Sequence, residues 1–81
     1  MPSVWVYVLL FEVDRFYVGL TAHLDRRLVE HKRRQSPSTK QFKGDFIVIY
    51  KKSFPTYDEA RKHEKFLKSG GGRAWLKSLR T

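Results

Sequence analysis

The sequence contains no cysteine, which removes two kinds of stabilising link from consideration. No disulfide can brace the fold, and a zinc site built on thiolates is excluded. The absence also fits a reducing compartment, and we expect a cytoplasmic protein. A chain of 81 residues buries only about 60–65% of the surface that its unfolded form exposes. We therefore expect one compact domain over residues 1–81.

Long hydrophobic runs are also absent. The apolar run near the N-terminus covers only residues 4–11, whereas a helix that crosses a bilayer needs about 20 apolar residues. No basic segment precedes this run, so it lacks the form of a signal peptide. We interpret the run as a β-strand and expect no association with a membrane.

Acidic residues are scarce. Asp and Glu together number 8 against 17 Lys and Arg, so the formal net charge is +9. Such an excess favours a polyanionic partner, because each phosphate that is neutralised releases counterions. The basic residues are spread over several segments, which favours DNA or RNA over an anionic membrane surface. The alternative is that the charges only keep the protein soluble.

Three segments have the composition of β-strands. Val4–Phe11 is apolar on both alternating faces, which is typical of a central strand covered on both sides. Phe16–Leu20 is the expected return strand after a turn. Phe46–Tyr50 is aromatic and β-branched, which predicts a third, buried strand. Gly19 implies either an unusual backbone angle or a close approach by another group.

The first helix is expected to start at Thr21 as N-cap and to run to about Arg34. Leu24, Arg27, Leu28 and His31 share one face of it by their spacing. A polar loop over residues 35–44 follows, with proline and glycine as breakers.

A second helix is predicted to begin at Thr56, because residues 56–59 have the form of a capping box. Its apolar stripe contains Tyr57, Ala60 and Leu67, with Glu64 among them. Gly70–Gly72 should stop this helix near Ser69, and Arg73–Leu79 should form a short third helix. The expected fold is α+β, a three-stranded antiparallel sheet flanked by helices in the order β-β-α-β-α-α.

Four polar features occupy positions that packing alone does not explain. They are Tyr7, Tyr17, the pair Arg27 and His31, and Glu64. Each has an ordinary alternative: a core ring with its hydroxyl at the surface, an arginine lying over apolar neighbours, a hydrogen-bonded histidine, or an ion-paired glutamate. Together they offer a base, a cation, a proton carrier and a metal ligand, which is the minimum set for hydrolysing a phosphodiester.

The spacing of these residues resembles the GIY-YIG nuclease superfamily, which includes the catalytic module of UvrC-type repair nucleases and intron homing endonucleases. Tyr7 in WVYVLL and Tyr17 in YVGLT lie ten residues apart, and Arg27 follows after ten more. His31 comes on the next helical turn, and Glu64 lies in ARKHEKFLK. Two features depart from the pattern: the first motif keeps only its tyrosine, and the asparagine that many members carry in the last helix is missing.

The resemblance implies a metal-dependent endonuclease that cleaves DNA with low sequence specificity. Glu64 would hold one Mg²⁺ or Mn²⁺ ion, and no small-molecule cofactor is implied. Arg27 would bind the phosphate bidentately. Tyr7 or Tyr17 would act as base or orient the water, and His31 would relay a proton by titrating near neutrality. Gly19 would be the structural glycine of the second motif.

Contacts with the phosphate backbone are expected from five basic residues at the end of the first helix and in the following loop. These residues are Lys32, Arg33, Arg34, Lys40 and Lys43. Such contacts position a strand without reading its bases. Two alternatives stay open: a nucleic-acid-binding module of the same fold with little or no activity, and a basic protein–protein adaptor. Neither the choice between DNA and RNA nor the oligomeric state follows from the sequence.

Overall fold

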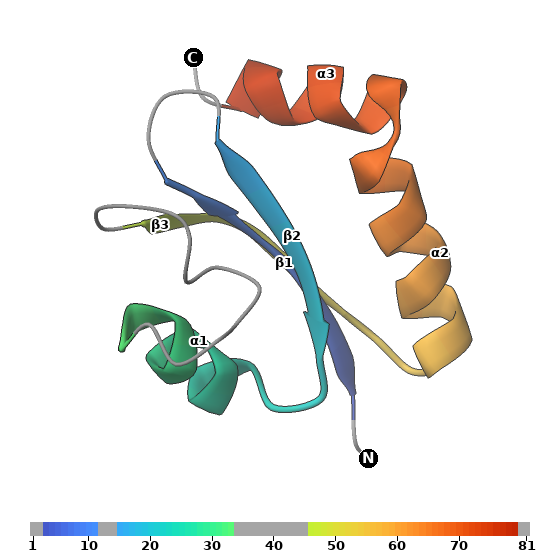
Figure 1. The fold of residues 1–81 in the computed structure, drawn as a ribbon. Helices are drawn as coiled ribbons and strands as arrows, with labels where there is room; N and C mark the ends of the chain where they lie inside the picture. The colour runs from blue at the N-terminus through green and yellow to red at the C-terminus, as the bar shows by residue number, and fades with distance from the viewer. Residues whose placement is uncertain (1–2, 12–14, 34–45, 80–81) are drawn as a thin grey trace.

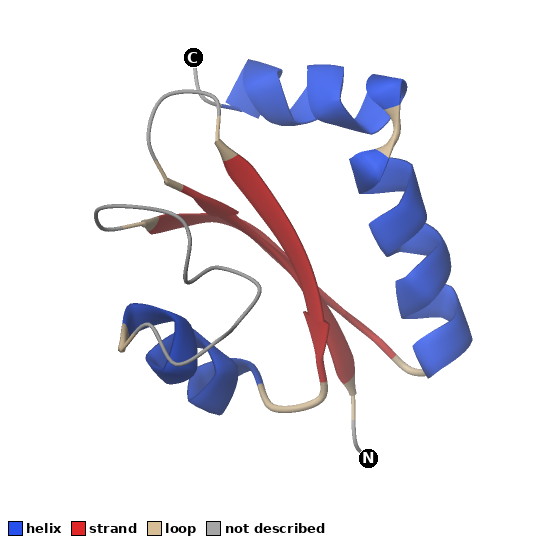
Figure 2. Ribbon diagram, in the orientation of Figure 1, coloured by secondary structure: helices blue, strands red, loops and turns tan. Residues whose placement is uncertain are grey.

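The computed structural model describes residues 3–11, 15–33 and 46–79. They form one three-stranded antiparallel sheet and three helices (Figures 1 and 2). The order β-β-α-β-α-α and the α+β class are as predicted. The elements are β1 (Val4–Leu10), β2 (Phe16–Thr21), α1 (Leu24–Lys32), β3 (Ile47–Phe54), α2 (Tyr57–Lys68) and α3 (Gly70–Leu79).

Strand β1 is the centre of the sheet, which has the strand order β2-β1-β3. Val6, Tyr7, Val8 and Leu9 are fully buried. The prediction of a central strand is confirmed, because a strand with two apolar faces is stable only when both faces are covered.

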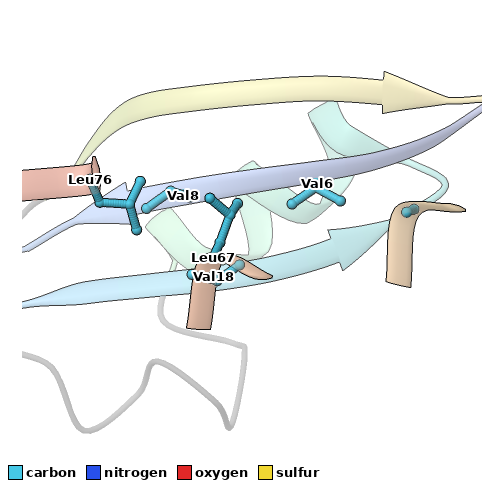
Figure 3. Close-up of a cluster of buried hydrophobic side chains, with 6 residues drawn as sticks. Val6, Val8, Val18, Leu67 and Leu76 are labelled. Carbon is cyan, nitrogen blue, oxygen red and sulfur yellow. The ribbon is translucent and has the colours of Figure 1, made fainter. Parts of the chain in front are cut away.

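The two faces of β1 build two separate cores. Helices α2 and α3 cover one face, and α1 covers the other (Figure 1). On the α2 face, valines of β1 and β2 pack against Leu67 and Leu76 (Figure 3). On the α1 face, the buried cluster consists of Tyr7, Leu9, Phe11 and Leu24. The second core contains Tyr7, and Tyr17 packs at its margin, which makes this face the place to look for chemistry.

Strand β3 differs from the prediction of a buried strand over residues 46–50. It runs to Phe54 and forms an edge of the sheet, with Ile47 61% exposed. Its register shifts beside Val8, so that Ile49 and Tyr50 both pack toward the α2 core. Such a bulge bends an edge strand. Composition alone could not show that this strand forms an edge of the sheet built by the described residues.

Helix α1 starts later than predicted. His23 is the N-cap, and Thr21 is still the last residue of β2. The Thr21 hydroxyl accepts a hydrogen bond from the His23 N–H at 3.0 Å, so it stabilises the turn before the helix instead of capping it. The helix ends at Lys32 with Arg33 as C-cap; residue 34, the predicted end, lies outside the described residues.

Helix α2 begins as predicted. The Thr56 hydroxyl oxygen accepts a hydrogen bond from the Glu59 N–H, and the Glu59 carboxylate accepts one from the Thr56 hydroxyl. These two bonds tie both ends of the capping box together at the start of the helix.

Helix α2 ends at Lys68 with Ser69 as C-cap, close to the predicted end. Helix α3 starts before the predicted Arg73, because the three glycines form its first turn. A Cβ atom at Gly72 would lie 2.0 Å from the carbonyl oxygen of Phe66. Glycine at this position therefore allows α3 to pack directly on the end of α2. None of the described helices is long and apolar enough to cross a membrane.

Candidate active site

Tyr7 and Gly19 face each other across the β1–β2 ladder. A Cβ atom at Gly19 would lie 2.2 Å from Cζ of Tyr7, so the missing side chain leaves the space in which the phenol ring lies. The expected close approach at Gly19 is thus made by Tyr7. Tyr17 lies two residues before Gly19 on the same face of β2, and its ring centroid is 6.2 Å from that of Tyr7.

Helix α1 brings His31 to this pair of phenols. The side chain is buried, with 3% of the residue exposed, and Nε2 lies 2.7 Å from the Tyr7 hydroxyl oxygen. The His31 ring also meets the Tyr17 ring edge-on, with centroids 5.2 Å apart. His31 follows Leu24 by two helical turns, so both side chains enter the same core. Sequence periodicity therefore placed His31 correctly.

Burial controls the protonation of the pair. It lowers the pKa of His31 to about 4, with repulsion from Arg27 acting in the same direction and Glu30 opposing it. Burial likewise raises the pKa of Tyr7 to about 12, assisted by Tyr17 and opposed by Arg27. Both groups are neutral at pH 7, and the phenol hydroxyl and Nε2 share one hydrogen bond, whose donor depends on which imidazole nitrogen carries the proton. The expectation that His31 titrates near neutrality is therefore wrong.

Arg27 lies one helical turn before His31 and has 30% of its side chain exposed. Its Nη1 donates to Oε1 of Glu30 at 3.0 Å. The same guanidinium is close enough to Tyr7 to lower the pKa of the phenol. Arg27 thus connects the buried rings with the surface.

Glu30 was not among the predicted site residues. Its carboxylate contacts Arg27 and lies 3.6 Å from Nε of Arg26. Arg27 holds the pKa of this carboxyl below its usual range. The signal was present in the sequence, because residues three and four apart on a helix are neighbours.

A hollow of about 300 Å³ opens where β2 ends and α1 begins. Leu20 and Thr21 form one wall; the charged lining consists of Arg26, Arg27 and Glu30. His23 completes it. Two guanidinium groups against one carboxylate make this hollow a suitable place for a phosphate.

Glu64 comes from the other side of the sheet, because α2 packs on the face opposite α1 (Figure 1). His63 contacts Tyr50 and Phe54 of β3. Glu64 is one residue further around the helix, on the other flank of the buried positions Ala60 and Leu67, and so lies toward β2.

The Glu64 carboxylate is held by two cations. Oε1 lies 3.6 Å from Nε of Arg61, and Oε2 lies 3.3 Å from Nζ of Lys68; the side chain is 13% exposed. Glu64 thus lies at the edge of the buried stripe, as the ion-paired alternative anticipated. Tyr57, the first predicted member of that stripe, is exposed.

The family model of the GIY-YIG catalytic domain matches residues 3–76. The chain belongs to the GIY-YIG family. Comparison with curated proteins finds no match. Among solved structures, the chain is similar to the UPF0213 protein BH0048 from Bacillus halodurans, determined by NMR in solution. The identity is 28% and the TM-score 0.58, covering 96% of this chain and 85% of that one.

The GIY-YIG tyrosines, arginine and histidine are therefore adjacent in space, whereas the glutamate approaches from across the sheet. In the described part of the chain, no group of three or more His, Cys, Asp and Glu side chains could hold a metal ion. A single carboxylate suits Mg²⁺ or Mn²⁺ only when waters and phosphate oxygens complete the coordination. Glu64 fits this limited role, provided that an ion competes with Arg61 and Lys68.

The predicted backbone contacts of this GIY-YIG domain are only partly described. Lys32 and Arg33 are exposed at the end of α1. Arg34, Lys40 and Lys43 lie outside the described residues.

Proposed function

We propose that this GIY-YIG domain is a metal-dependent endonuclease that hydrolyses phosphodiester bonds in DNA with low sequence specificity. The observation that carries the proposal is the position of Arg27. It lines a basic hollow at the end of β2 and also acts on the buried Tyr7. Hydrolysis needs a bound phosphate, an oriented water and stabilisation of the added negative charge.

Arg27 is the residue that binds the phosphate to be cleaved. A guanidinium presents parallel N–H donors that match two phosphate oxygens, which a lysine cannot do. In the free protein one of these donors is bonded to Glu30 at 3.0 Å. Glu30 keeps Arg27 oriented until the phosphate replaces it. We therefore assign Glu30 a positioning role.

Tyr17 is the better choice for the phenol that orients the attacking water. The Tyr7 hydroxyl is already hydrogen-bonded to His31, and burial raises the pKa of Tyr7 to about 12, so it is a poor base. The Tyr7–His31 pair then serves to hold the Tyr17 ring, which contacts both. His31 does not need to carry a proton in this scheme.

Glu64 would hold the Mg²⁺ or Mn²⁺ ion, which when bound supplies positive charge to the phosphate and the leaving oxygen. Strand β2 is an edge strand. Side chains from both faces of the sheet can therefore reach DNA that lies along it. This arrangement allows Arg27 on one face and Glu64 on the other to act on one strand.

Low specificity follows from the types of groups available. The described cations around β2 are arginines and lysines suited to phosphate oxygens, and such contacts position a strand without reading its bases. We propose that the protein works in the cytoplasm and acts on DNA. Cleavage of RNA should be measured beside cleavage of DNA.

Nicking of supercoiled plasmid tests the proposal. We expect nicking with Mg²⁺ or Mn²⁺ and none with chelator. Arg27→Ala and Glu64→Ala should each reduce the rate by about 100-fold or more, the usual loss of one charge-stabilising group. Lys62→Ala, a neighbouring exposed lysine on α2, is the control and should nick normally. A parent protein that nicks equally well in chelator contradicts the metal requirement.

A binding module with little activity is the second candidate. It is favoured by the ion pairs that occupy both oxygens of Glu64 and by the absence of asparagine. In that case the parent protein binds DNA without nicking it, and binding survives both alanine substitutions.

A further inference from the structure

A second basic hollow borders the same edge strand on the opposite face of the sheet. It measures about 370 Å³ and lies between β2 and the two C-terminal helices. Residues 16–18 form one wall, Leu67 and Lys68 come from the end of α2, and Arg73 and Leu76 come from α3. No residue of the α1 side except Tyr17 takes part, so this hollow is distinct from the one at Arg27.

The charge in this hollow comes from Lys68 and Arg73. Among the described residues that line it, these are the charged ones, and both are cations. They extend from different helices over apolar side chains of β2 and α3. Lys68 is 57% exposed, and its Nζ contacts Glu64 at 3.3 Å. Two exposed cations over an apolar floor suit an anion that has several oxygens, such as a phosphate diester.

The two hollows lie at opposite ends of β2. One is bordered by Leu20 and Thr21, the other by residues 16–18. From Thr21 to Tyr17 the strand advances roughly 13 Å, at about 3.3 Å per residue. A DNA strand rises about 3.4 Å per phosphate along the helix axis, so about four phosphate intervals cover this length. One nucleic-acid strand along the edge can therefore reach both hollows.

We infer that Lys68 and Arg73 bind a phosphate of the DNA backbone that flanks the phosphate at Arg27, so that the edge of β2 is the track of the cleaved strand. The assignment of the cleaved phosphate to Arg27 rests on the proposed function. The binding itself does not, because it can be measured without cleavage. The inference adds two phosphate-binding residues outside the predicted basic loop.

The salt dependence of DNA binding tests the inference. Anisotropy of a labelled duplex is measured in EDTA over a range of NaCl concentrations. Each lost phosphate contact lowers the slope of log Kobs against log salt by about 0.9 on duplex DNA. We expect this change for Arg73→Ala and again for Lys68→Ala. Arg73→Lys keeps the charge and should keep the slope.

Lys62→Ala is the matched control, because Lys62 is exposed on α2 but does not line the hollow. Its slope should stay within about 0.3 of the parent value, less than half of one contact. Equal changes in all three alanine variants would mean that only the overall charge matters, and the inference would be wrong. Unchanged slopes for Arg73→Ala and Lys68→Ala would also overturn it.

Lys68→Ala could change DNA binding by releasing the Glu64 carboxylate, which is an ion-pair partner of Lys68. Arg73→Ala is the cleaner test, because the described ion pairs of Glu64 are with Arg61 and Lys68 and not with Arg73. Thermal melts confirm that each variant is folded. A parent that binds with the expected slopes but never nicks defeats the nuclease proposal and leaves the inference standing. A parent that nicks DNA, with alanine variants whose salt slopes equal that of the parent, supports the nuclease proposal and overturns the inference. A parent that does not bind DNA contradicts both.

Discussion

Each face of the sheet carries a tyrosine–histidine pair, and the two pairs have almost the same hydrogen bond. The Tyr7 hydroxyl lies 2.7 Å from Nε2 of His31, and the Tyr50 hydroxyl lies 2.8 Å from Nε2 of His63. In both, the tyrosine is on a strand and the histidine is on the helix that covers that face. The difference is the strand: β1 is central and β3 is an edge.

The position of the strand decides what each pair can do. Tyr7 is fully buried, and the pKa of His31 falls to about 4. Tyr50 is only partly buried, and burial lowers the pKa of His63 in the same direction, together with the charge of Lys52. The same type of hydrogen bond therefore joins two buried, neutral side chains in the first pair and two partly exposed side chains in the second.

The neighbours of the pairs differ as well. His31 contacts Tyr17 and lies within the electrostatic reach of Arg27, which opens to a basic hollow. His63 contacts Phe54 and stacks on Phe66, in an aromatic cluster at the edge of the α2 core. A tyrosine and a histidine in contact therefore do not make a site by themselves. What distinguishes the first pair is Arg27, which acts on both Tyr7 and His31 and also lines the basic hollow.

The largest expected effect comes from Gly19→Ala, which breaks only the first pair. The new Cβ would lie 2.2 Å from the Tyr7 ring, whereas Tyr50 faces Val8 across its ladder and needs no glycine. We expect a loss of about 3 kcal/mol or more in the free energy of unfolding, since a buried ring cannot move away. Urea denaturation measures this value.

Gly71→Ala is the control for the glycine substitution. No atom lies within 4 Å of a Cβ at Gly71, which is in the first turn of α3. The same change there should leave stability equal or raise it by up to about 1 kcal/mol. A Gly19→Ala protein as stable as its parent would contradict the close packing of Tyr7.

The next largest effect is expected from acid, which should lower the free energy of unfolding more through His31 than through His63. The folded pKa of His31 is about 4, below the ordinary histidine value of about 6.5, so only the unfolded chain takes up a proton between these values. The contribution of His31 is therefore complete above about pH 6.5 and falls by up to about 3 kcal/mol as the pH drops toward 4. His63 has the same sign with a smaller loss.

Unfolding free energies of the parent, His31→Gln and His63→Gln between pH 4 and 7 measure this difference. Carboxylates contribute equally to all three proteins, so the parent minus variant difference isolates each histidine. The difference should shrink steeply with acid for His31→Gln and weakly for His63→Gln. Equal pH dependence in the two variants would show that His31 is no more buried than His63.

The smallest effect is expected from removal of single hydroxyl groups. Tyr7→Phe removes the hydroxyl that is hydrogen-bonded to the buried Nε2 of His31 and should cost about 1–3 kcal/mol. Tyr50→Phe should cost about 0.5–1 kcal/mol, because water can replace the hydroxyl at the partly buried His63. Thermal or urea unfolding of both variants gives the comparison, and a larger loss for Tyr50→Phe would reverse it.

The central strand, the start of α2 and the buried face of α1 could all be predicted from the sequence. All three follow from local rules: apolar residues on both alternations of β1, a capping box at Thr56, and helical spacing between Leu24 and His31. The family motif followed in the same way, since its tyrosines and arginine are recognised by their intervals along the chain.

The meeting of the polar groups and their ionisation became visible only in the three-dimensional fold. Composition did not show that β3 is an edge strand of the described sheet, that α3 packs on the end of α2 at Gly72, or that the helix of Glu64 covers the face opposite α1. Burial of His31 and Tyr7 moved both pKa values away from neutrality, contrary to the expected role of the histidine. The physical reason is that intervals along a chain set the direction of side chains within one element. Solvent exposure and charge neighbours come from elements that are distant in sequence.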